Sequence, residues 1–330
     1  MTDVVTGANG YIGNVLVKEL LKRGRKVRAI VRNTSNLKSL ENLENSDLEI
    51  FTGDISDLKS LCNAFADADA VYHLAGKISL MPGDRHEIYN VNYLCAKNVI
   101  QACKECNVKR LIYTSTIHAL IEPPSDKIIN EEIPYCVSNN KSIYDRSKAL
   151  ASVEVLKATQ DGLDAVIVNP TGVIGPYDFQ ISALTKTFID FSKKRLKLAI
   201  EGAYDFVDVR DVAIGHILAY EKGKTGENYI LSGERIKVSQ LMKILEESTG
   251  IKAPEHYLPV NFAKFIASFM PIYYKITGIK PYFTKYSVDI LLSNSCISHE
   301  KATKELGYKP RPVKDSVKDA IIWLKEIGYI

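Results

Sequence analysis

Short apolar runs alternate with segments of helical periodicity over the first 170 residues, and this alternation limits the possible folds most strongly. The runs are Asp3–Thr6, Val27–Val31, Leu48–Phe51, Ala70–Leu74, Arg110–Thr114 and Ala165–Asn169. The clearest helical segments between them are Asn14–Arg23, Val91–Cys106 and Ile143–Gln160. Strands that are apolar at successive positions are buried on both faces. The pattern therefore predicts an α/β fold with a doubly wound parallel sheet and helices on both sides.

Beyond Pro170 the alternation becomes less regular. Phe206–Ala213 and Gly226–Leu231 are predicted as further sheet, and Ser239–Thr249 and Val313–Glu326 as helices. We therefore expect a nucleotide-binding domain at 1–172 plus about 205–233. A smaller, mostly helical substrate lobe is expected at about 173–204 and 234–330. Residues 118–142 contain three prolines and are predicted to form a substrate-side loop or lid.

Composition excludes several classes of protein. The chain of 330 residues is 46% hydrophobic and 25% charged, with a net charge of +4, which indicates a soluble protein that does not bind nucleic acid. It shows neither a signal peptide nor an apolar run of membrane-spanning length, so a cytoplasmic location is expected. Phe262–Tyr274 is predicted as a core-facing or groove-lining helix. Cys103 and Cys106 are predicted as packed thiols, and no metal site is expected.

A glycine-rich turn follows the first predicted strand. Gly7, Gly10 and Gly13 are spaced by two residues each, and Tyr11 and Ile12 open the following helix. Glycines let the backbone turn tightly and approach a pyrophosphate, while the helix N-terminus offers unpaired N–H groups to the anion. The position of this turn predicts a Rossmann dinucleotide site.

Three further strand ends complete the predicted cofactor site. Arg32 closes the second strand, where folds of this kind that use NAD usually carry an acid, so it favours the 2′-phosphate of NADP(H), with NAD as the alternative. Asp54, with Ile55, follows the third strand and either binds the adenine or caps the next helix. Ala75 and Gly76 follow the fourth strand and leave room for the dinucleotide.

Tyr144 and Lys148 lie one turn apart on a predicted helix. A nearby ammonium group and an oxidised nicotinamide stabilise a phenolate, so the pair is predicted to exchange a proton with a substrate oxygen. The spacing alone is weak, because Tyr93/Lys97 and Tyr220/Lys224 share it. Only Tyr144 follows a strand that ends in hydroxyl residues. Thr116 is the preferred third catalytic residue and Ser115 the second choice.

These segments resemble the extended short-chain dehydrogenase/reductases, the NAD-dependent epimerase/dehydratase superfamily, and within it the dihydroflavonol-reductase-like branch. The matching pieces include Thr6–Gly13, His73–Gly76, Tyr113–Thr116, Tyr144–Lys148 and Asn169–Pro176. The resemblance implies that Thr116 is the catalytic hydroxyl, Tyr144 the acid–base and Lys148 the ribose-binding lysine. It also implies that Pro170 to Val173 pass the nicotinamide.

The same resemblance implies a structural role for Asn92 and a homodimer formed through the Val91–Cys106 and Ile143–Gln160 helices. The chain departs from the family at Cys95-Ala96, where Gly-Thr is common. It also has Thr116-Ile117-His118, without the Asp-Glu pair of the sugar 4,6-dehydratases, which argues against dehydration.

The leading function is an NADP(H)-dependent oxidoreductase that acts on a carbonyl or secondary alcohol of a small molecule. The alternative is a nucleotide-sugar epimerase with retained NAD, for which Lys186, Lys193, Lys194, Arg195 and Arg210 are candidate diphosphate ligands. A redox-sensing protein that binds NADP(H) without chemistry is the third possibility. Such a protein would not need Thr116, Tyr144 and Lys148. Tyr177, Phe179 and Tyr204 are candidate pocket aromatics, although core packing explains aromatic residues more often.

Overall fold

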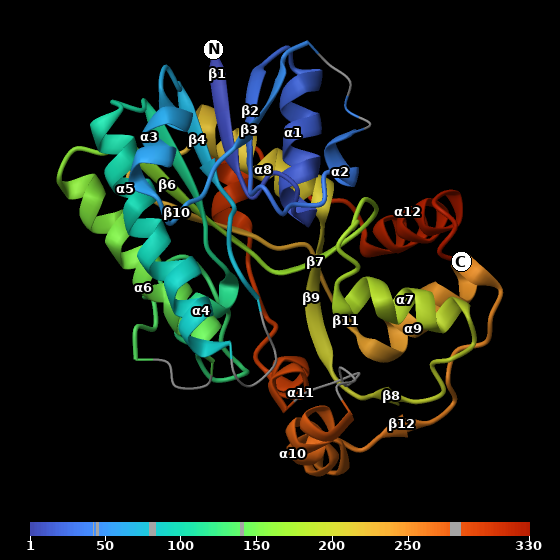
Figure 1. Cartoon of the computed structure of the whole chain (residues 1–330). Helices are drawn as coiled ribbons and strands as arrows, with labels where there is room; N and C mark the ends of the chain where they lie inside the picture. The colour runs from blue at the N-terminus through green and yellow to red at the C-terminus, as the bar shows by residue number, and fades with distance from the viewer. Residues whose placement is uncertain (42, 44–45, 79–83, 139–141, 278–284) are drawn as a thin grey trace.

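One seven-stranded parallel sheet organises the chain (Figure 1). The computed structural model describes all residues except 42, 44–45, 79–83, 139–141 and 278–284. In spatial order, the strands are β10 (Asn228–Leu231), β6 (Ala165–Pro170), β5 (Arg110–Thr114), β4 (Ala70–His73), β1 (Thr2–Thr6), β2 (Lys26–Val31) and β3 (Leu48–Thr52). Every neighbouring pair is parallel. The strand order reverses between β1 and β4, which is where doubly wound sheets bind ligands. The predicted Rossmann fold is confirmed.

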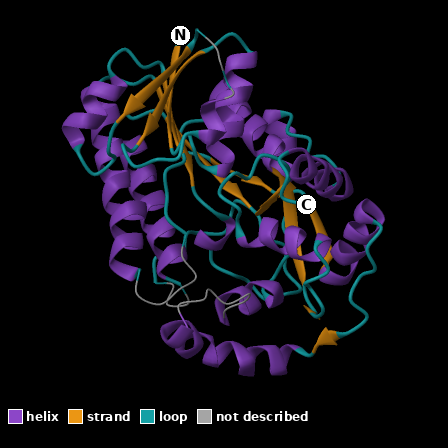
Figure 2. Cartoon of the chain, turned by 45° about the vertical axis from the view of Figure 1, so that its right-hand side comes forward, coloured by secondary structure: helices purple, strands orange, loops and turns teal. Residues whose placement is uncertain are grey.

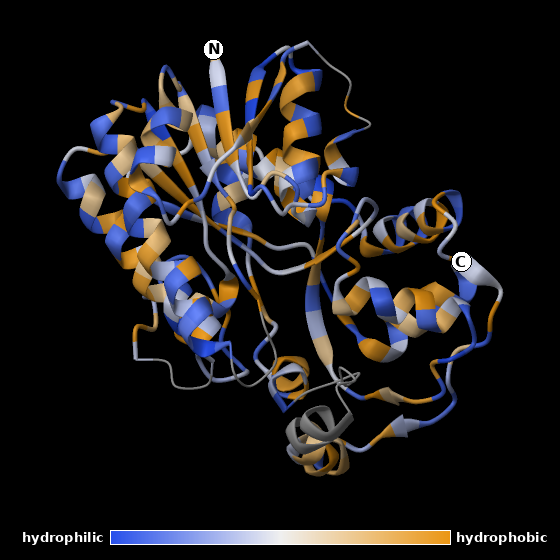
Figure 3. Ribbon diagram, in the orientation of Figure 1, coloured by the Kyte–Doolittle hydropathy of each residue, from blue (hydrophilic) through white to orange (hydrophobic). Residues whose placement is uncertain are grey.

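Helices cover both faces of this sheet. One face carries α1 (Tyr11–Lys22), α8 (Val209–Lys222) and η3 (Ala302–Leu306), and the other carries α3 (Leu58–Phe65), α5 (Cys95–Glu105) and α6 (Ile143–Gln160). Neighbouring residues of a strand enter opposite cores, as Val4 and Val5 do. This arrangement explains why the strands are apolar at successive positions, whereas the helices carry both hydrophobic and hydrophilic residues (Figure 3).

A second, smaller sheet supports the remainder of the chain (Figure 2). It consists of β11 (Glu234–Lys237), β9 (Ala203–Asp208) and β7 (Gly172–Ile174), with β9 antiparallel to β11 and parallel to β7. Helices α7 (Ala183–Ser192), α9 (Val238–Thr249) and α12 (Val313–Glu326) share its core. Beyond them lie the short strands β8 (Ala199–Ile200) and β12 (Tyr257–Leu258) and the helices α10 (Val260–Thr277) and α11 (Lys285–Leu292).

The chain passes between the two sheets at Thr171. Strand β6 ends at Pro170 and β7 begins at Gly172, so the carboxyl end of the large sheet lies next to the small one. The Thr171 hydroxyl donates a hydrogen bond of 2.6 Å to the Asp205 carboxylate, which is buried. Burial raises the pKa of Asp205 to about 6, and the Thr171 bond opposes this shift. The crossing fixes β9 beside the predicted nicotinamide segment.

The predicted strand at Phe206–Ala213 is wrong in its second half. Strand β9 ends at Asp208, and α8 begins at the next residue. The Asp208 side chain accepts a hydrogen bond from the Arg210 backbone N–H at 2.8 Å and so caps the helix. An aspartate at this position is a helix-start signal, and the apolar residues on either side of it concealed that signal.

The predicted loop at 118–142 is held by several contacts. Leu120 and Tyr135 form an antiparallel bridge, and Ile129 forms a parallel bridge with Ile297. The Asn294 side-chain amide donates hydrogen bonds to the carbonyl oxygens of Pro123, Pro124 and Lys127. The described middle of this segment is therefore anchored to residues 294–297 and to β10, and its role on the substrate side stays a prediction. Residues 139–141 lie outside the described residues.

The predicted Phe262–Tyr274 helix lies within α10, which has one buried face and one exposed face. Ala263 and Ala267 are buried with Val288 of α11, as a core-facing helix requires. The side chains of Phe262, Phe265 and Phe269 are more than half exposed. The sequence did not predict this exposed aromatic face. Among the described residues, no helix combines the length and the apolar character needed to cross a bilayer.

Candidate active site

The glycine turn forms a cradle for a pyrophosphate between β1 and α1. Gly7 has a φ of +70°, and a Cβ there would lie 2.7 Å from the Ala75 backbone nitrogen. A Cβ on Gly13 would overlap the Gly7 carbonyl oxygen. Helix α1 begins directly after Gly10, whose N-cap position carries no side-chain hydrogen bond. Because Gly7 and Gly13 lack side chains, the backbone can pack tightly here and a dinucleotide phosphate can bind at the positive end of α1.

The first residues of α1 are tied to the second sheet. The Tyr11 hydroxyl donates a hydrogen bond of 2.7 Å to the Gly175 carbonyl oxygen just after β7. Burial and the nearby Asp178 and Asp208 carboxylates raise the pKa of Tyr11, so this phenol stays protonated. Tyr11 therefore fixes the helix N-terminus relative to the crossing between the sheets, and Ile12 packs against the core below it.

Arg32 and Asp54 lie near one another at the ends of β2 and β3. Arg32 is exposed, and its backbone N–H donates to the Ser35 hydroxyl at 3.1 Å. The Asp54 carboxylate accepts bonds from Ser56, and these bonds, with the Arg32 charge, lower its pKa. Asp57 caps α3 instead, so Asp54 does not have the capping role, and its contact with the adenine stays a prediction. Ile55 follows, and its carbonyl oxygen accepts a bond from Asn98.

Tyr144, Thr116 and Lys148 meet at the carboxyl end of β5. Helix α6 begins after Ser142, whose hydroxyl accepts the Tyr144 backbone N–H at 3.1 Å. The Thr116 side chain lies beside the Tyr144 phenol and acts to lower its pKa. The Lys148 ammonium lies one turn farther along α6 and donates to the Thr114 carbonyl oxygen at 2.8 Å. The structure thus brings together the three residues selected from the sequence.

Lys148 also adjoins the predicted cofactor path. A Cβ placed on Gly76 would lie 3.5 Å from the Lys148 ammonium nitrogen. Ala75, just before it, donates its backbone N–H to the Thr6 hydroxyl at 3.2 Å. The same hydroxyl bonds the buried His73 ring, whose pKa falls to about 3 through burial and the Lys148 charge. His73 is therefore a neutral packed residue, as expected, and the lysine is the cation of this region.

The electrostatics of Tyr144 differ from the expectation. Burial, followed by the neighbouring Asp145 carboxylate, raises the pKa of the phenol, and the nearby Thr116 side chain only partly opposes this. Burial lowers the pKa of Lys148 to about 8. Lys148 does not lower the Tyr144 pKa below its ordinary value here. The phenol is therefore protonated at neutral pH, which is the state that donates a proton to a carbonyl oxygen.

Asn92 connects two segments that border the site. Its side-chain amide accepts the Lys77 backbone N–H at 2.8 Å and donates to the Lys77 carbonyl oxygen at 3.0 Å. It also donates to the Ser147 hydroxyl of α6 at 3.2 Å. Asn92 lies in the π-helical turn η1 (Asn90–Leu94), between α4 (Arg85–Tyr89) and α5. The predicted structural role of Asn92 is confirmed, since it joins the segment after Gly76 to the helix that carries Tyr144.

Sequence reasoning missed two side-chain pairs near Tyr144. The Tyr204 hydroxyl and the His118 Nε2 atom are 2.5 Å apart, and their rings stack at 15°. The Tyr286 hydroxyl donates to the Asp145 carboxylate at 2.7 Å. Tyr204 was considered only as a possible pocket aromatic. Phe179, another of that group, packs instead on Trp323 in the core of the second sheet.

Pro170 and Val173 lie on either side of the crossing between the sheets. Pro170 ends β6 and Val173 lies within β7, so both border the carboxyl end of the large sheet. A Cβ on Gly172, between them, would lie 2.7 Å from the Tyr204 ring. The predicted nicotinamide segment therefore packs directly against Tyr204.

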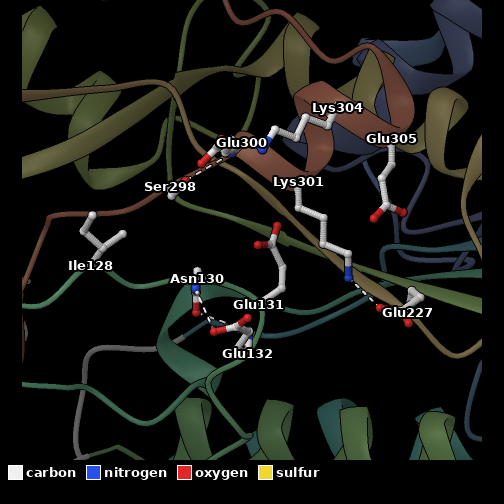
Figure 4. A pocket seen from close by; sticks show the side chains of 10 residues that line it. All are labelled: Ile128, Asn130, Glu131, Glu132, Glu227, Ser298, Glu300, Lys301, Lys304 and Glu305. Atoms are coloured by element: carbon white, nitrogen blue, oxygen red, sulfur yellow. Dashed lines mark hydrogen bonds and ion pairs between the residues drawn. The ribbon is translucent and has the colours of Figure 1, made fainter.

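A separate pocket lies at the open edge of the large sheet (Figure 4). Its lining residues are Ile128, Asn130, Glu131, Glu132, Glu227, Ser298, Glu300, Lys301, Lys304 and Glu305. Glu131 accepts the Ile230 backbone N–H of β10 at 2.8 Å, and Lys301 donates to the Asn228 carbonyl oxygen at 3.0 Å. These side chains satisfy the backbone of an edge strand, which is a structural task. In the described part of the chain, no group of metal-ligating side chains is assembled.

Comparison with known proteins shows the family of this chain. The model of the 3-beta hydroxysteroid dehydrogenase/isomerase family matches residues 4–235. The chain belongs to this family. The match places it among the extended short-chain dehydrogenase/reductases, as the sequence motifs predicted, and its members are oxidoreductases and epimerases with a nicotinamide-binding fold.

Several relatives cover the whole chain. Sterol demethylase protein B of Methylococcus capsulatus is 34% identical, with 100% of both chains aligned. A putative dihydroflavonol 4-reductase of Synechocystis is 31% identical over 99% of this chain and 95% of its own. The crystal structure of gox2253 superposes with a TM-score of 0.86 at 32% identity, covering 100% of this chain and 99% of that one. UDP-glucuronic acid 4-epimerase from Bacillus cereus, solved with NAD, shares the fold at 22% identity and a TM-score of 0.78, with 99% of each chain covered.

Proposed function

We propose that this member of the family is an NADP(H)-dependent oxidoreductase that interconverts a carbonyl compound and a secondary alcohol. The observation that carries the proposal is the placement of Tyr144 and Lys148 one turn apart on α6 at the end of β5, with Lys148 beside Gly76. When bound, the nicotinamide supplies or accepts the hydride. Tyr144 donates its proton to the carbonyl oxygen during reduction, and Thr116 hydrogen-bonds the same oxygen. Lys148 is assigned to the nicotinamide ribose, which its place beside Gly76 supports.

Arg32 supports NADP(H) over NAD(H) as the preferred cofactor. It is exposed at the end of β2, the position at which a ribose-binding acid would favour NAD. A guanidinium group pairs with a phosphate through charge-assisted hydrogen bonds. The cofactor contacts we propose are Gly7, Gly10, Tyr11, Ile12, Gly13, Arg32, Asp54, Ile55, Ala75, Gly76, Tyr144, Lys148, Pro170 and Val173.

A steroid-type ring alcohol or ketone is the first substrate class to test, because the family model and the Methylococcus relative both carry steroid or sterol names. The purified chain should oxidise NADPH in the presence of a 3-oxo steroid, with the alcohol as product. If NADPH is oxidised neither with a 3-oxo steroid nor with any other ketone of a panel, the oxidoreductase proposal is contradicted.

The competing function is a nucleotide-sugar epimerase with retained NAD. The structural likeness to the Bacillus epimerase concerns the fold alone. Among the proposed diphosphate ligands, Arg210 already forms ion pairs with Asp208 and Asp319 at 2.7 Å. Conversion of UDP-glucose without net cofactor consumption, by protein that copurifies with NAD, would replace the oxidoreductase by the epimerase.

We further propose a cytoplasmic homodimer formed through η1, α5 and α6. Leu94 of η1 is 44% exposed on this helical layer, although it is a large apolar residue. Sedimentation of the wild type and of Leu94→Asp tests this arrangement. A dimer that the substitution leaves intact would contradict the proposed interface.

A further inference from the structure

Three phenylalanine residues form one exposed face of α10. Phe262, Phe265 and Phe269 are spaced three and four residues apart, so they lie on the same side of the helix. They are 51%, 62% and 52% exposed, and the rings of Phe265 and Phe269 lie 5.2 Å apart, edge to face. The other side of the helix is buried through Ala263 and Ala267. Helix α10 is therefore fixed to the fold by small residues and carries its large aromatic residues toward solvent.

This aromatic face lies at one end of the molecule. Figures 1 and 2 place α10 and β12 beyond the second sheet, at the end opposite the N-terminus. Strand β8 pairs with β12 there, and Ile200 of β8 packs against the buried side of α10. The segments 193–201 and 255–270 therefore form one surface region, which we call the distal surface.

Basic residues outnumber acidic residues on the distal surface. It contains five lysine or arginine residues and two acidic residues, Glu201 and Glu255, at its borders. The exposed basic residues precede β8 and are Lys193, Lys194, Arg195 and Lys197. Arg195 approaches Asp190 at 3.9 Å, and Lys264 of α10 pairs with Asp289 at 3.2 Å. The region thus combines an apolar face with a surplus of positive charge.

This combination indicates the kind of partner that the distal surface fits. Exposed apolar patches with polar surroundings mark contact sites for proteins or membranes. A helix with aromatic residues on one side and lysines nearby binds in the headgroup region of a bilayer, where the cations attract anionic lipids. A second copy of the chain would bring its own surplus of cations against this one, and like charges repel. The charge therefore favours an anionic bilayer over self-association.

We propose that the distal surface docks this protein on an anionic lipid bilayer. The three phenylalanine rings enter the boundary between headgroups and acyl chains, and the basic segment 193–197 lies on the headgroups. Helix α11, which packs on α10, reaches Asp145 through the Tyr286 hydroxyl, next to Tyr144. The docked helix is thus one helix away from the proposed reaction centre. The docking itself does not depend on which reaction the protein catalyses.

Cosedimentation with lipid vesicles tests the aromatic face. The full-length wild type should bind vesicles of equimolar phosphatidylcholine and phosphatidylglycerol about tenfold or more tightly than vesicles of phosphatidylcholine alone. The triple variant Phe262→Ser/Phe265→Ser/Phe269→Ser should bind the anionic vesicles about tenfold or more weakly than the wild type. Ile128→Ser is the matched control, because Ile128 is 60% exposed outside the distal surface, and it should bind like the wild type.

A second set of variants tests the charge. Lys193→Gln/Lys194→Gln/Lys197→Gln should weaken binding to the anionic vesicles by about tenfold or more and leave binding to the neutral ones unchanged. High salt should have the same effect on the wild type, because it screens these charges. The control replaces three other exposed lysines by glutamine and should bind like the wild type; these are Lys26, Lys59 and Lys309.

The thermal midpoint of each variant shows whether the fold is retained. If the triple phenylalanine variant does not fold, Phe265→Ser, at the most exposed of the three positions, decides in its place with a smaller loss of binding. A wild type that stays in the supernatant with anionic vesicles would overturn the proposal, and so would a folded phenylalanine variant that binds them as tightly as the wild type. A wild-type dimer that becomes monomeric in the phenylalanine variant, without vesicle binding, would show that a second copy covers this face instead.

Discussion

The Lys148 ammonium group is bonded to the Thr114 carbonyl oxygen at 2.8 Å, and this contact joins the middle of α6 to the end of β5. The lysine is only 4% exposed. Burial and this hydrogen bond together fix the position of the ammonium group. A cation in a buried position reduces stability.

Lys148→Met should change how stability depends on pH. Burial lowers the folded-state pKa of Lys148 to about 8, against 10.5 as its ordinary value. Between these values the unfolded chain binds more protons than the folded chain, so the free energy of unfolding of the wild type rises with pH. We expect the wild type to gain up to about 3 kcal/mol relative to the variant between neutral pH and pH 10.5. Urea unfolding over this range measures the difference, and a constant difference would refute the assignment.

Tyr144→Phe should abolish turnover and leave cofactor binding intact. The phenyl ring keeps the packing of α6 but has no proton to transfer, so kcat should fall by at least about a hundredfold. Tyr93→Phe provides a matched control, because Tyr93 also lies one turn before a lysine, with the Lys97 ammonium 5.9 Å from its ring. Steady-state rates and NADPH titration of both variants check the prediction. Full activity of Tyr144→Phe would end the proposed mechanism.

Arg32→Asp should shift the cofactor preference from NADPH toward NADH. The substitution removes the cation proposed for the 2′-phosphate and supplies a carboxylate for ribose hydroxyls. Charge-assisted hydrogen bonds of this kind correspond to about 10- to 100-fold in affinity. The ratio of the two dissociation constants is the measurement. Lys26→Asp, an exposed change at the start of the same strand, should leave the ratio unchanged, and an unchanged ratio in Arg32→Asp would argue against the assignment.

Much of the large sheet was predictable because its signal is local. Val4 and Val5 face opposite cores, and this double burial appears in the sequence as an apolar run. Tyr144 could be separated from Tyr93 and Tyr220 because it alone lies between strands that end in polar residues at the same edge of the sheet. Parallel strands bring such ends together whatever the residues between them.

The side-chain pairs around Tyr144 could not be predicted in this way. His118 and Tyr204 meet because β9 pairs with β7 and β11 in a small sheet whose register no periodicity reveals. Tyr286 reaches Asp145 from a helix 141 residues farther along the chain. Such contacts depend on how the second sheet is placed on the first, through the crossing at Thr171.

Asp145→Asn should move the pH dependence of alcohol oxidation to lower pH. Oxidation requires the Tyr144 phenolate as proton acceptor, and the Asp145 carboxylate contributes to raising the phenol pKa. The asparagine removes that charge but can still accept the Tyr286 hydroxyl bond, so the local packing should persist. The phenolate fraction at a given pH, and with it the oxidation rate, should therefore increase. Reduction near neutral pH should change little, since the phenol stays protonated in both proteins.

Asp289→Asn provides the control for this prediction. It removes a carboxylate that pairs with Lys264 on the surface and should leave the profile of kcat against pH in place. A profile of Asp145→Asn that stays fixed or moves to higher pH would show that this carboxylate does not set the acidity of Tyr144.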